Sequence, residues 1–360
     1  MYSNELKAIN KSNRYRKRVI YDENLIDLAS NDYLGLSSKK QLLNRAVARV
    51  NMFKSHSPKA SQVVNGYHPI HKDFEDFLCR QNGFEGAIVA GSGFLANMAL
   101  IEALPRKGDI LILDAEYHAS GILAAKLVDA EVKFFDHNCP ENLKNILENT
   151  RYKRAIIAVE GIYSMSGDLL NKEIFNIVDI YDNTLLIVDE AHSSGVLGKK
   201  FTGIFDFYGI EIKSNYIKMG TLGKAYGSYG AYILSSEHII EFLQNRSKAL
   251  IYATAPSLID IELAHQGMLY ILKNRDSLHI EIQKRQNLIK KYFNINIRGL
   301  IFAYEMDSSS AVLDMQEKLQ KEGFLVGAIR PPTVEKSILR IIPRIDVPIE
   351  DLERLFNVYM

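Results

Sequence analysis

The feature that most constrains this chain is a regular alternation of two hydrophobic patterns between about residues 85 and 235. Short runs rich in β-branched and other apolar residues alternate with segments of helical period. The runs are GAIVA, DILIL, EVKFF, RAIIAVE, TLLIVDE, NYIKMG and YGAYIL, and the segments between them include FLANMALIEAL, HASGILAAKLV and EIFNIVDIYDN. Continuous apolar strands separated by helices are typical of a largely parallel sheet covered on both faces. We therefore predict an α/β fold with a mostly parallel, seven-stranded sheet.

The rest of the chain predicts two further regions. Residues 1–35 start with a basic, helix-compatible stretch and look like an N-terminal arm, and residues 36–245 hold the large α/β domain. Residues 246–360 contain a long helical stretch from Leu258 to Phe293, followed by short strands and helices, which predicts a smaller C-terminal α+β domain. No repeat or low-complexity linker separates these regions, so the boundaries are soft.

Composition and charge exclude several classes of protein. The 360 residues carry a formal net charge of +1, which gives no electrostatic reason to expect a nucleic acid or an acidic membrane as partner. The two cysteines, Cys79 and Cys139, lie far apart and predict neither a disulfide framework nor a metal site. No stretch has the pattern of a secretory signal or of a membrane span. We therefore expect a cytoplasmic enzyme.

Polar, glycine-spaced clusters follow five of the predicted strands. They are GSGFLANMAL, DAEYHAS, GIYSMSGD, DEAHSSG and TLGKAYG. In an open α/β sheet, ligands bind beyond the carboxyl ends of the strands, so these clusters are the candidate site.

Three of these clusters also fit other chemistries. GSGFLA fits a loose G-x-G-x-x-A dinucleotide fingerprint, and Asp114 follows at the distance of a ribose-binding acid, which leaves a nicotinamide-dependent dehydrogenase as an alternative. The same turn serves any phosphate, because Gly91 and Gly93 allow close approach to the start of a helix. DEAH and TLGKAYG together suggest a nucleotide hydrolase, but KMGTLGKA has Lys218 and Ala225 where a phosphate loop needs glycine and a hydroxyl.

Pyridoxal 5′-phosphate is one chemical species that uses all of these clusters. It needs a lysine, an anion-binding helix start, a carboxylate beside its ring nitrogen and a flat group against its ring. Lys224, between glycines, supplies the lysine, and Asp189 supplies the carboxylate. Gly93 and Phe94 begin the helix, and His118 supplies the flat group.

These motifs, taken in order with SNDYLGLS, IYATAPS and AIRPPTV, resemble the α-oxoamine synthases, which are fold-type I pyridoxal-phosphate-dependent transferases. The resemblance covers the chain from about residue 14 to the end. It implies that Lys224, His118 and Asp189 are catalytic, and that a homodimer shares its active sites. The cofactor-binding positions that it implies are Gly93, Phe94, His118, Ser164, Asp189, His192, Thr221, Lys224 and Thr254, the last reaching the neighbouring subunit's phosphate. The substrate-contacting positions that it implies are Arg16 with Arg14 as its rival, Asn31, His118, Thr333 and Arg340, with no metal.

The resemblance also implies a reaction. AIRPPTV is closer to family members that condense L-alanine with a pimeloyl thioester of coenzyme A or acyl carrier protein, in biotin biosynthesis, than to members that use glycine or serine. Another α-oxoamine synthase, of the glycine C-acetyltransferase or 5-aminolevulinate synthase type, stays an alternative. In HSPKASQVVNGY, Pro58 and Lys59 occupy positions that are normally small in the family, which affects the predicted entrance for the acyl donor.

Overall fold

The computed structural model describes residues 1–12 and 14–359. Its centre is a seven-stranded sheet with the strand order β2-β8-β7-β6-β5-β3-β4. The strands are β2 (Gly86–Ala90), β3 (Ile110–Asp114), β4 (Glu131–Phe135), β5 (Ala155–Glu160), β6 (Thr184–Asp189), β7 (Tyr216–Thr221) and β8 (Ala231–Ser235). All pairings among β3 to β7 are parallel, whereas β8 runs antiparallel to both of its neighbours. The predicted mostly parallel, seven-stranded sheet is confirmed.

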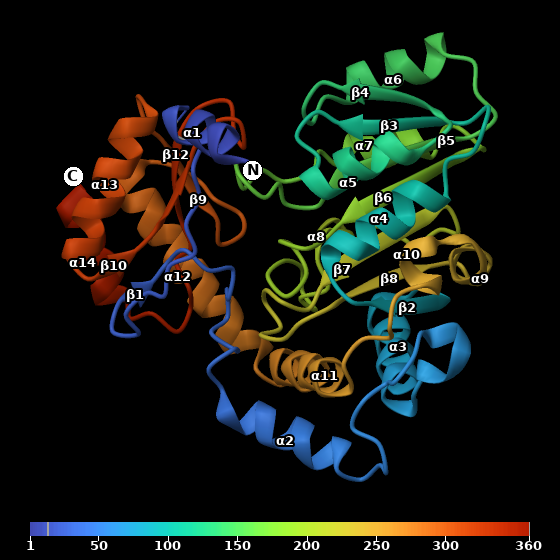
Figure 1. Cartoon of the computed structure of the whole chain (residues 1–360), viewed down its shortest axis with the longest axis horizontal. Helices are drawn as coiled ribbons and strands as arrows, with labels where there is room; N and C mark the ends of the chain where they lie inside the picture. The colour runs from blue at the N-terminus through green and yellow to red at the C-terminus, as the bar shows by residue number, and fades with distance from the viewer. Residues whose placement is uncertain (13, 360) are drawn as a thin grey trace.

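Two layers of helices cover this sheet, as Figure 1 shows. One face packs against α4 (Gly93–Ala103), α5 (Ala119–Ala124), α9 (Glu237–Arg246) and α10 (Lys248–Ile251), with a short 3-10 turn, Ala125–Leu127, after α5. The other face packs against α3 (Pro69–Asn82), α6 (Pro140–Asn149), α7 (Glu173–Val178), α8 (Ile204–Tyr208) and α11 (Leu258–Lys273). The helix α2 (Lys40–Val50) packs on α11, and a π-helical turn, Gln62–Gly66, precedes α3. Because successive residues of the central strands β3, β5 and β6 alternate between the two cores, both faces of these strands are apolar.

A second, smaller sheet lies beside the large one. Its order is β11-β12-β9, all antiparallel. The elements here are α12 (Arg275–Phe293), β9 (Phe302–Glu305), α13 (Ser309–Lys321), β10 (Phe324–Leu325), β11 (Gly327–Ile329), β12 (Ile338–Ile341) and α14 (Ile349–Tyr359). The predicted C-terminal α+β arrangement is therefore present, with its own hydrophobic core.

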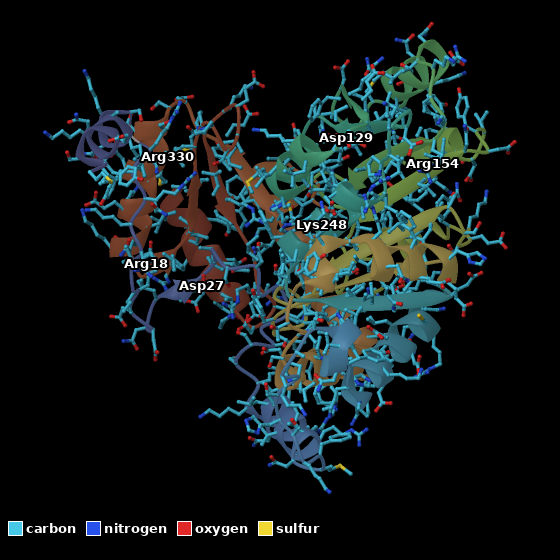
Figure 2. The ribbon with its side chains drawn as sticks, turned by 45° about the vertical axis from the view of Figure 1, so that its right-hand side comes forward. Arg18, Asp27, Asp129, Arg154, Lys248 and Arg330 are labelled. Atoms are coloured by element: carbon cyan, nitrogen blue, oxygen red, sulfur yellow. The ribbon has the colours of Figure 1, made fainter. Side chains whose placement is uncertain are left out.

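The N-terminal segment packs with this smaller sheet. It contains α1 (Ser3–Lys11) and β1 (Ile26–Asp27), and β1 pairs in parallel with β10. Leu28 is part of the C-terminal core. Figure 2 shows Arg18 and Asp27 on the same side of the molecule as Arg330, away from Arg154 on the large sheet.

The predicted helical stretch from Leu258 to Phe293 is two helices that meet at Asn274. Asn274 leaves the helical region with φ −111° and ψ 20°, and its side-chain amide donates to the carbonyl oxygen of Tyr270 at 2.7 Å. An asparagine competes for backbone hydrogen bonds in this way, which is why it can end a helix inside a continuous apolar pattern.

The domain boundary predicted at residue 245 stays a prediction, but side-chain packing changes further along the chain. Leu258 in α11 and Ile282 in α12 belong to a core of the large sheet, whereas Leu288 and Ile289 belong to the C-terminal core. The helix α12 therefore bridges the two sheets.

Candidate active site

The candidate site lies at the carboxyl edge of the large sheet, where it faces the C-terminal sheet. A cleft of about 1330 Å³ opens there. Its walls include His118 and Ser164 from the large sheet, and Thr333 from the loop between β11 and β12. The cleft thus joins strand-end residues to residues that are distant in the sequence.

Lys224 follows β7 and reaches back to the end of β6. Its Nζ lies 2.7 Å from Nε2 of His192, and Nδ1 of His192 bonds to the hydroxyl of Tyr33. Burial lowers the pKa of Lys224 to about 8, and the positive charge of Arg340 acts in the same direction. Burial also holds the pKa of His192 well below its usual value, so this ring is neutral. The result is an amine that loses its proton far more readily than an exposed lysine does.

Asp189 ends β6 and is 4% exposed. Its Oδ1 accepts from the backbone N–H of Ala191 at 2.9 Å, and its Oδ2 accepts from Nδ2 of Asn97 at the same distance. Both carboxylate oxygens are therefore held in place.

Glu160 is a second buried carboxyl, at the end of the neighbouring strand β5. Its Cα is the register partner of that of Asp189, and it is 2% exposed. Oε2 accepts from the backbone N–H of Ser164 at 3.0 Å, whereas Oε1 has no hydrogen-bond partner among the described residues. Burial and the nearby charge of Asp189 raise the pKa of Glu160 well above its usual value, and Lys224 opposes this shift.

The residues predicted to hold the cofactor phosphate form a tight cradle. A Cβ added at Gly93 would lie 2.6 Å from Cγ2 of Thr221, so only glycine fits there. The hydroxyl of Thr221 is buried without a hydrogen-bond partner among the described residues. Gly93 and Phe94 form the first turn of α4, where backbone N–H groups lack partners within the helix. An orphaned hydroxyl beside a helix start suits a phosphate group, so the residues present fit pyridoxal phosphate.

Arg340 and Asn31 form the opposite side of the site. Arg340 lies in β12 and is 6% exposed; its Nε donates to the carbonyl oxygen of Ser164 at 2.9 Å. Its Nη2 donates to Oδ1 of Asn31 at 3.0 Å. Neither of these bonds uses Nη1. The guanidinium is thus held in position, with donor capacity to spare for a carboxylate.

The structure links three of the predicted site residues less directly to Lys224 and Arg340. They are Thr333, Thr254 and Arg16. Thr333 lines the cleft, whereas Thr254 is exposed in the loop between α10 and α11. Arg16 is exposed in the segment between α1 and β1, and no hydrogen bond or ion pair of the described residues joins it to Lys224 or Arg340. Its rival Arg14 has its backbone N–H on the carbonyl oxygen of Ile9, at the end of α1.

The unusual SPKAS segment packs beside the loop that carries Thr254. The backbone N–H of Ala255 donates to the carbonyl oxygen of Ala60 at 3.0 Å. Lys59 has a φ of 68°, the left-handed region that glycine adopts most easily. Glycine at this position would therefore carry less backbone strain.

Asp114 is not free to bind a ribose, as the dinucleotide alternative requires. Its Oδ1 accepts from Nδ1 of His137 at 2.9 Å, and its Oδ2 accepts from the hydroxyl of Tyr163 at 2.7 Å. The carboxylate is fully buried. Burial lowers the pKa of His137, but its bonds to Asp114 and Asp168 outweigh this effect and raise that pKa to about 10. Asp114 therefore has a structural role, since it holds His137 and Tyr163, which line the cleft.

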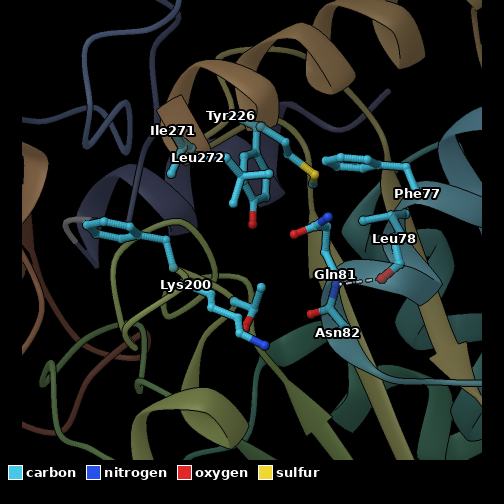
Figure 3. A pocket seen from close by; sticks show the side chains of 11 residues that line it. Phe77, Leu78, Gln81, Asn82, Lys200, Tyr226, Ile271 and Leu272 are labelled. Carbon is cyan, nitrogen blue, oxygen red and sulfur yellow. Dashed lines mark hydrogen bonds between the residues drawn. The ribbon is translucent and has the colours of Figure 1, made fainter. Parts of the chain in front are cut away.

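A second, much smaller cavity lies between α3, α11 and the loop around Phe201 (Figure 3). Its volume is about 20 Å³, which is room for about one water molecule. Tyr226 projects toward it, and the amide of Asn82 bonds to the carbonyl oxygen of Leu78 at its edge. This cavity is therefore too small to take a substrate.

Sequence reasoning missed several residues of the site, namely Tyr33, Asn97, Tyr117, Ser120 and Glu160. Glu160 could have been found, because it ends the run RAIIAVE directly before a glycine-containing cluster. Asn97 gave only a weak signal, as one of two polar residues, with Glu102, in a largely apolar helix.

Comparison with known proteins identifies the family. The model of the family described as "Aminotransferase class I and II" matches residues 23–358. The 8-amino-7-oxononanoate synthase of Helicobacter pylori (strain ATCC 700392 / 26695) is 44% identical over 358 residues, which are 99% of this chain and 96% of the relative.

Solved structures agree with this result. The 8-amino-7-oxononanoate synthase from Francisella tularensis is 26% identical with a TM-score of 0.78, covering 94% of this chain and 97% of that one. The serine palmitoyltransferase of S. paucimobilis with bound PLP-myriocin, at 22% identity, has a TM-score of 0.87 over 99% of this chain and 96% of that one, which shows the same fold. The dehydrogenase alternative is set aside. The chain belongs to the aminotransferase class I and II family and, within it, to the 8-amino-7-oxononanoate synthases, which are pyridoxal-phosphate-dependent acyltransferases of biotin biosynthesis.

Proposed function

We propose that this chain condenses L-alanine with a pimeloyl thioester to give 8-amino-7-oxononanoate, carbon dioxide and the free thiol carrier. The carrier is coenzyme A or acyl carrier protein. The observation that carries the proposal is the buried amine of Lys224, whose pKa is lowered to about 8 and which lies beside His192. The 44% identity to the 8-amino-7-oxononanoate synthase of Helicobacter pylori supports the product of this reaction.

The large sheet holds the cofactor in this proposal. Lys224 binds pyridoxal phosphate covalently, Asp189 pairs with its ring nitrogen, and His118 lies against its ring. Gly93, Phe94 and Thr221 bind the phosphate, and Ser164 and His192 bond on the side of the 3′-oxygen. The orphaned hydroxyl of Thr221 and the tight contact at Gly93 support this assignment.

Lys224 also moves the proton. When bound, pyridoxal phosphate supplies an electron sink for the charge left on the alanine Cα after that carbon loses its proton. An amine with a pKa near 8 is partly neutral at neutral pH and can accept this proton. Neutral His192, anchored by Tyr33, keeps Nζ in place. The protonated Lys224 then returns a proton at the end of the reaction.

Arg340 binds the alanine carboxylate, and Asn31 helps to hold the guanidinium in position. The Cα–carbonyl bond forms at the thioester carbon, the thiol leaves, and the carboxylate departs as carbon dioxide. His118 donates a hydrogen bond to the departing carboxylate or the thioester oxygen. Thr333 and Arg16, with Arg14 as its rival, contact the substrates at the rim of the cleft.

A homodimer completes the site in this proposal, with Thr254 of one subunit reaching the phosphate in the other. The exposure of Thr254 leaves it available for such a contact. We also place the enzyme in the cytoplasm. Within the described part of the chain, no helix is both long enough and apolar enough to cross a bilayer.

A substrate panel tests the proposal. The purified enzyme with pyridoxal phosphate is incubated with alanine, glycine or serine against pimeloyl, acetyl, succinyl and palmitoyl thioesters, and the products are identified by mass spectrometry. We expect the highest kcat/KM with alanine and a pimeloyl donor. A preference for glycine with an acetyl or succinyl donor would assign the chain to another α-oxoamine synthase. Pimeloyl-coenzyme A and pimeloyl-acyl carrier protein, compared at equal concentration, decide the carrier.

A further inference from the structure

Asn97 lies at the centre of a buried hydrogen-bond chain between Asp189 and His118. Asn97 is only 1% exposed. Nδ2 of Asn97 donates to Oδ2 of Asp189 at 2.9 Å and to Oγ of Ser120 at 3.0 Å, and Oδ1 accepts from the hydroxyl of Tyr117 at 2.6 Å. Reversing the amide would turn Oδ1 toward the Asp189 carboxylate, so that acceptor faced acceptor. The charge of Asp189 therefore determines which way the amide points.

The same chain determines which ring nitrogen of His118 carries a proton. Because Oγ of Ser120 already accepts from Asn97, its single O–H is free to donate to Nδ1 of His118, 2.7 Å away. The backbone N–H of Ser120 donates to the same nitrogen at 3.2 Å. Nδ1 is thus an acceptor without a proton, and the proton of the neutral ring is on Nε2.

The surroundings of His118 favour this neutral ring. Burial lowers the pKa of His118, and the positive charge of Lys224 lowers it further, while Asp189 opposes them. A proton added at Nδ1 would also face the backbone N–H of Ser120. Since Nδ1 is turned toward Ser120, Nε2 is the nitrogen available to a group in the cleft.

We infer that Asn97 is a positioning residue that holds His118 as its Nε2–H tautomer and ties that tautomer to the carboxylate of Asp189. His118 then meets the substrate as a hydrogen-bond donor and does not take up a proton through Nδ1. The identity of the group that His118 meets rests on the proposed function. The hydrogen bonds themselves do not depend on the proposed function. They join Tyr117, Asn97, Asp189, Ser120 and His118.

An isosteric substitution tests this inference. Asn97→Asp keeps the shape of the side chain but replaces both N–H donors by an acceptor, so Ser120 turns its O–H to the new carboxylate and leaves His118. The readout is the ring ¹⁵N signals of His118 in the holoenzyme labelled at its histidine rings, assigned by their absence from His118→Phe. We expect protonated Nε2 and unprotonated Nδ1 in the unsubstituted enzyme, and ring signals shifted toward a mixture of protonation forms in Asn97→Asp.

Kinetics provide a second readout. Loss of a hydrogen bond to a charged group costs roughly 10- to 100-fold, so kcat of Asn97→Asp should fall by about this factor. The KM for alanine should change less, because Arg340 is untouched. Ser120→Ala removes the hydroxyl that joins Asn97 to His118 and leaves the bonds of Asn97 with Asp189 and Tyr117 in place. It should shift the ring signals even if Asn97→Asp folds poorly.

The matched control is Asn82→Asp, the same isosteric change at an amide that bonds to Leu78 and Lys218, away from the cleft. It should leave the ring signals of His118 unchanged. A proton on Nδ1 in the unsubstituted enzyme, or ring signals that stay the same in both Asn97→Asp and Ser120→Ala, would overturn the inference. Absence of condensation by the unsubstituted enzyme would instead count against the proposed function, because the ring signals are read without turnover.

Discussion

The two walls of the candidate site are built in different ways. On the wall of the large sheet, Asp189 ends β6, and His192 and Lys224 follow β6 and the parallel strand β7. Nζ of Lys224 bonds to His192, and Asp189 accepts from Asn97 of α4. On the other wall, Arg340 bonds to Asn31 across 309 residues of sequence. The first wall depends on the topology of one sheet, and the second on how the N-terminal segment packs against the C-terminal sheet. We therefore expect substitutions in the first wall to affect the cofactor, and substitutions in the second to affect substrate binding.

Lys224→Ala should have the largest effect, because it removes the cofactor link and the proton acceptor together. Turnover should fall by roughly a thousandfold or more, with the fold retained. Activity and the visible absorption of bound cofactor are the measurements, and circular dichroism checks the fold. Lys218→Ala is the comparison for a neighbouring buried lysine, and it should retain the cofactor absorption. Turnover near that of the unsubstituted enzyme in Lys224→Ala would remove Lys224 from the mechanism.

Arg340→Lys should act on the second wall alone. A lysine cannot donate two parallel hydrogen bonds to a carboxylate, so the KM for alanine should rise by roughly 10- to 100-fold. The cofactor absorption should stay unchanged, because the contacts of Lys224 with His192 are intact. Steady-state kinetics with varied alanine test this, and a loss of cofactor without a change in KM would contradict the division into two walls.

Loading of the apoenzyme with pyridoxal phosphate should depend on pH with a midpoint near 8, the pKa of Lys224. The neutral amine is the nucleophile, and a lowered pKa makes it neutral at lower pH, so the rate should rise with pH and level off above 8. Below the midpoint it should fall about tenfold per pH unit. Stopped-flow absorbance measures the rate, with N-acetyl-lysine as the reference amine. A midpoint near 10.5, the ordinary pKa of a lysine, would mean that the surroundings of Lys224 do not lower its pKa.

Arg344→Ala should give the smallest effect on activity. Arg344 bonds to Asp27 at 2.9 Å, Asp32 at 3.3 Å and Asp346 at 2.7 Å, and so fastens the segment that carries Asn31 to the C-terminal sheet. Its loss should lower the melting temperature and raise the KM for alanine a few-fold, with the cofactor absorption unchanged. Arg154→Ala, which breaks the pair with Asp109 on the large sheet, is the control for lost stability alone. An equal rise of KM in both variants would argue against a role of the N-terminal segment in substrate binding.

The difference between the walls also explains what the sequence could predict. Strands of apolar residues followed by polar clusters predicted the sheet, and the rule that ligands bind at its carboxyl edge predicted that Lys224, Asp189 and His192 would lie together. Their roles stay predictions. Only the family resemblance placed Arg340, Asn31 and Ser164 at the site, and only the structure shows the bonds that join them, because no local pattern encodes packing between segments so far apart.

Other features depend on side-chain detail that a pattern does not carry. The break at Asn274 interrupts an apolar periodicity that looked continuous, since one side-chain bond to Tyr270 ends the helix. Asn97 looked like an ordinary helix residue, because its importance comes from its partners Asp189, Ser120 and Tyr117. Buried polar networks of this kind are determined by tertiary geometry.

The most direct test of the account is the identity of the lysine that holds the cofactor. The holoenzyme is reduced with borohydride, which fixes the bond between pyridoxal phosphate and lysine, then digested and mapped by mass spectrometry. The account predicts the cofactor mass on the peptide that contains Lys224. The mass on Lys218, the buried lysine six positions earlier, or on any other lysine would contradict it.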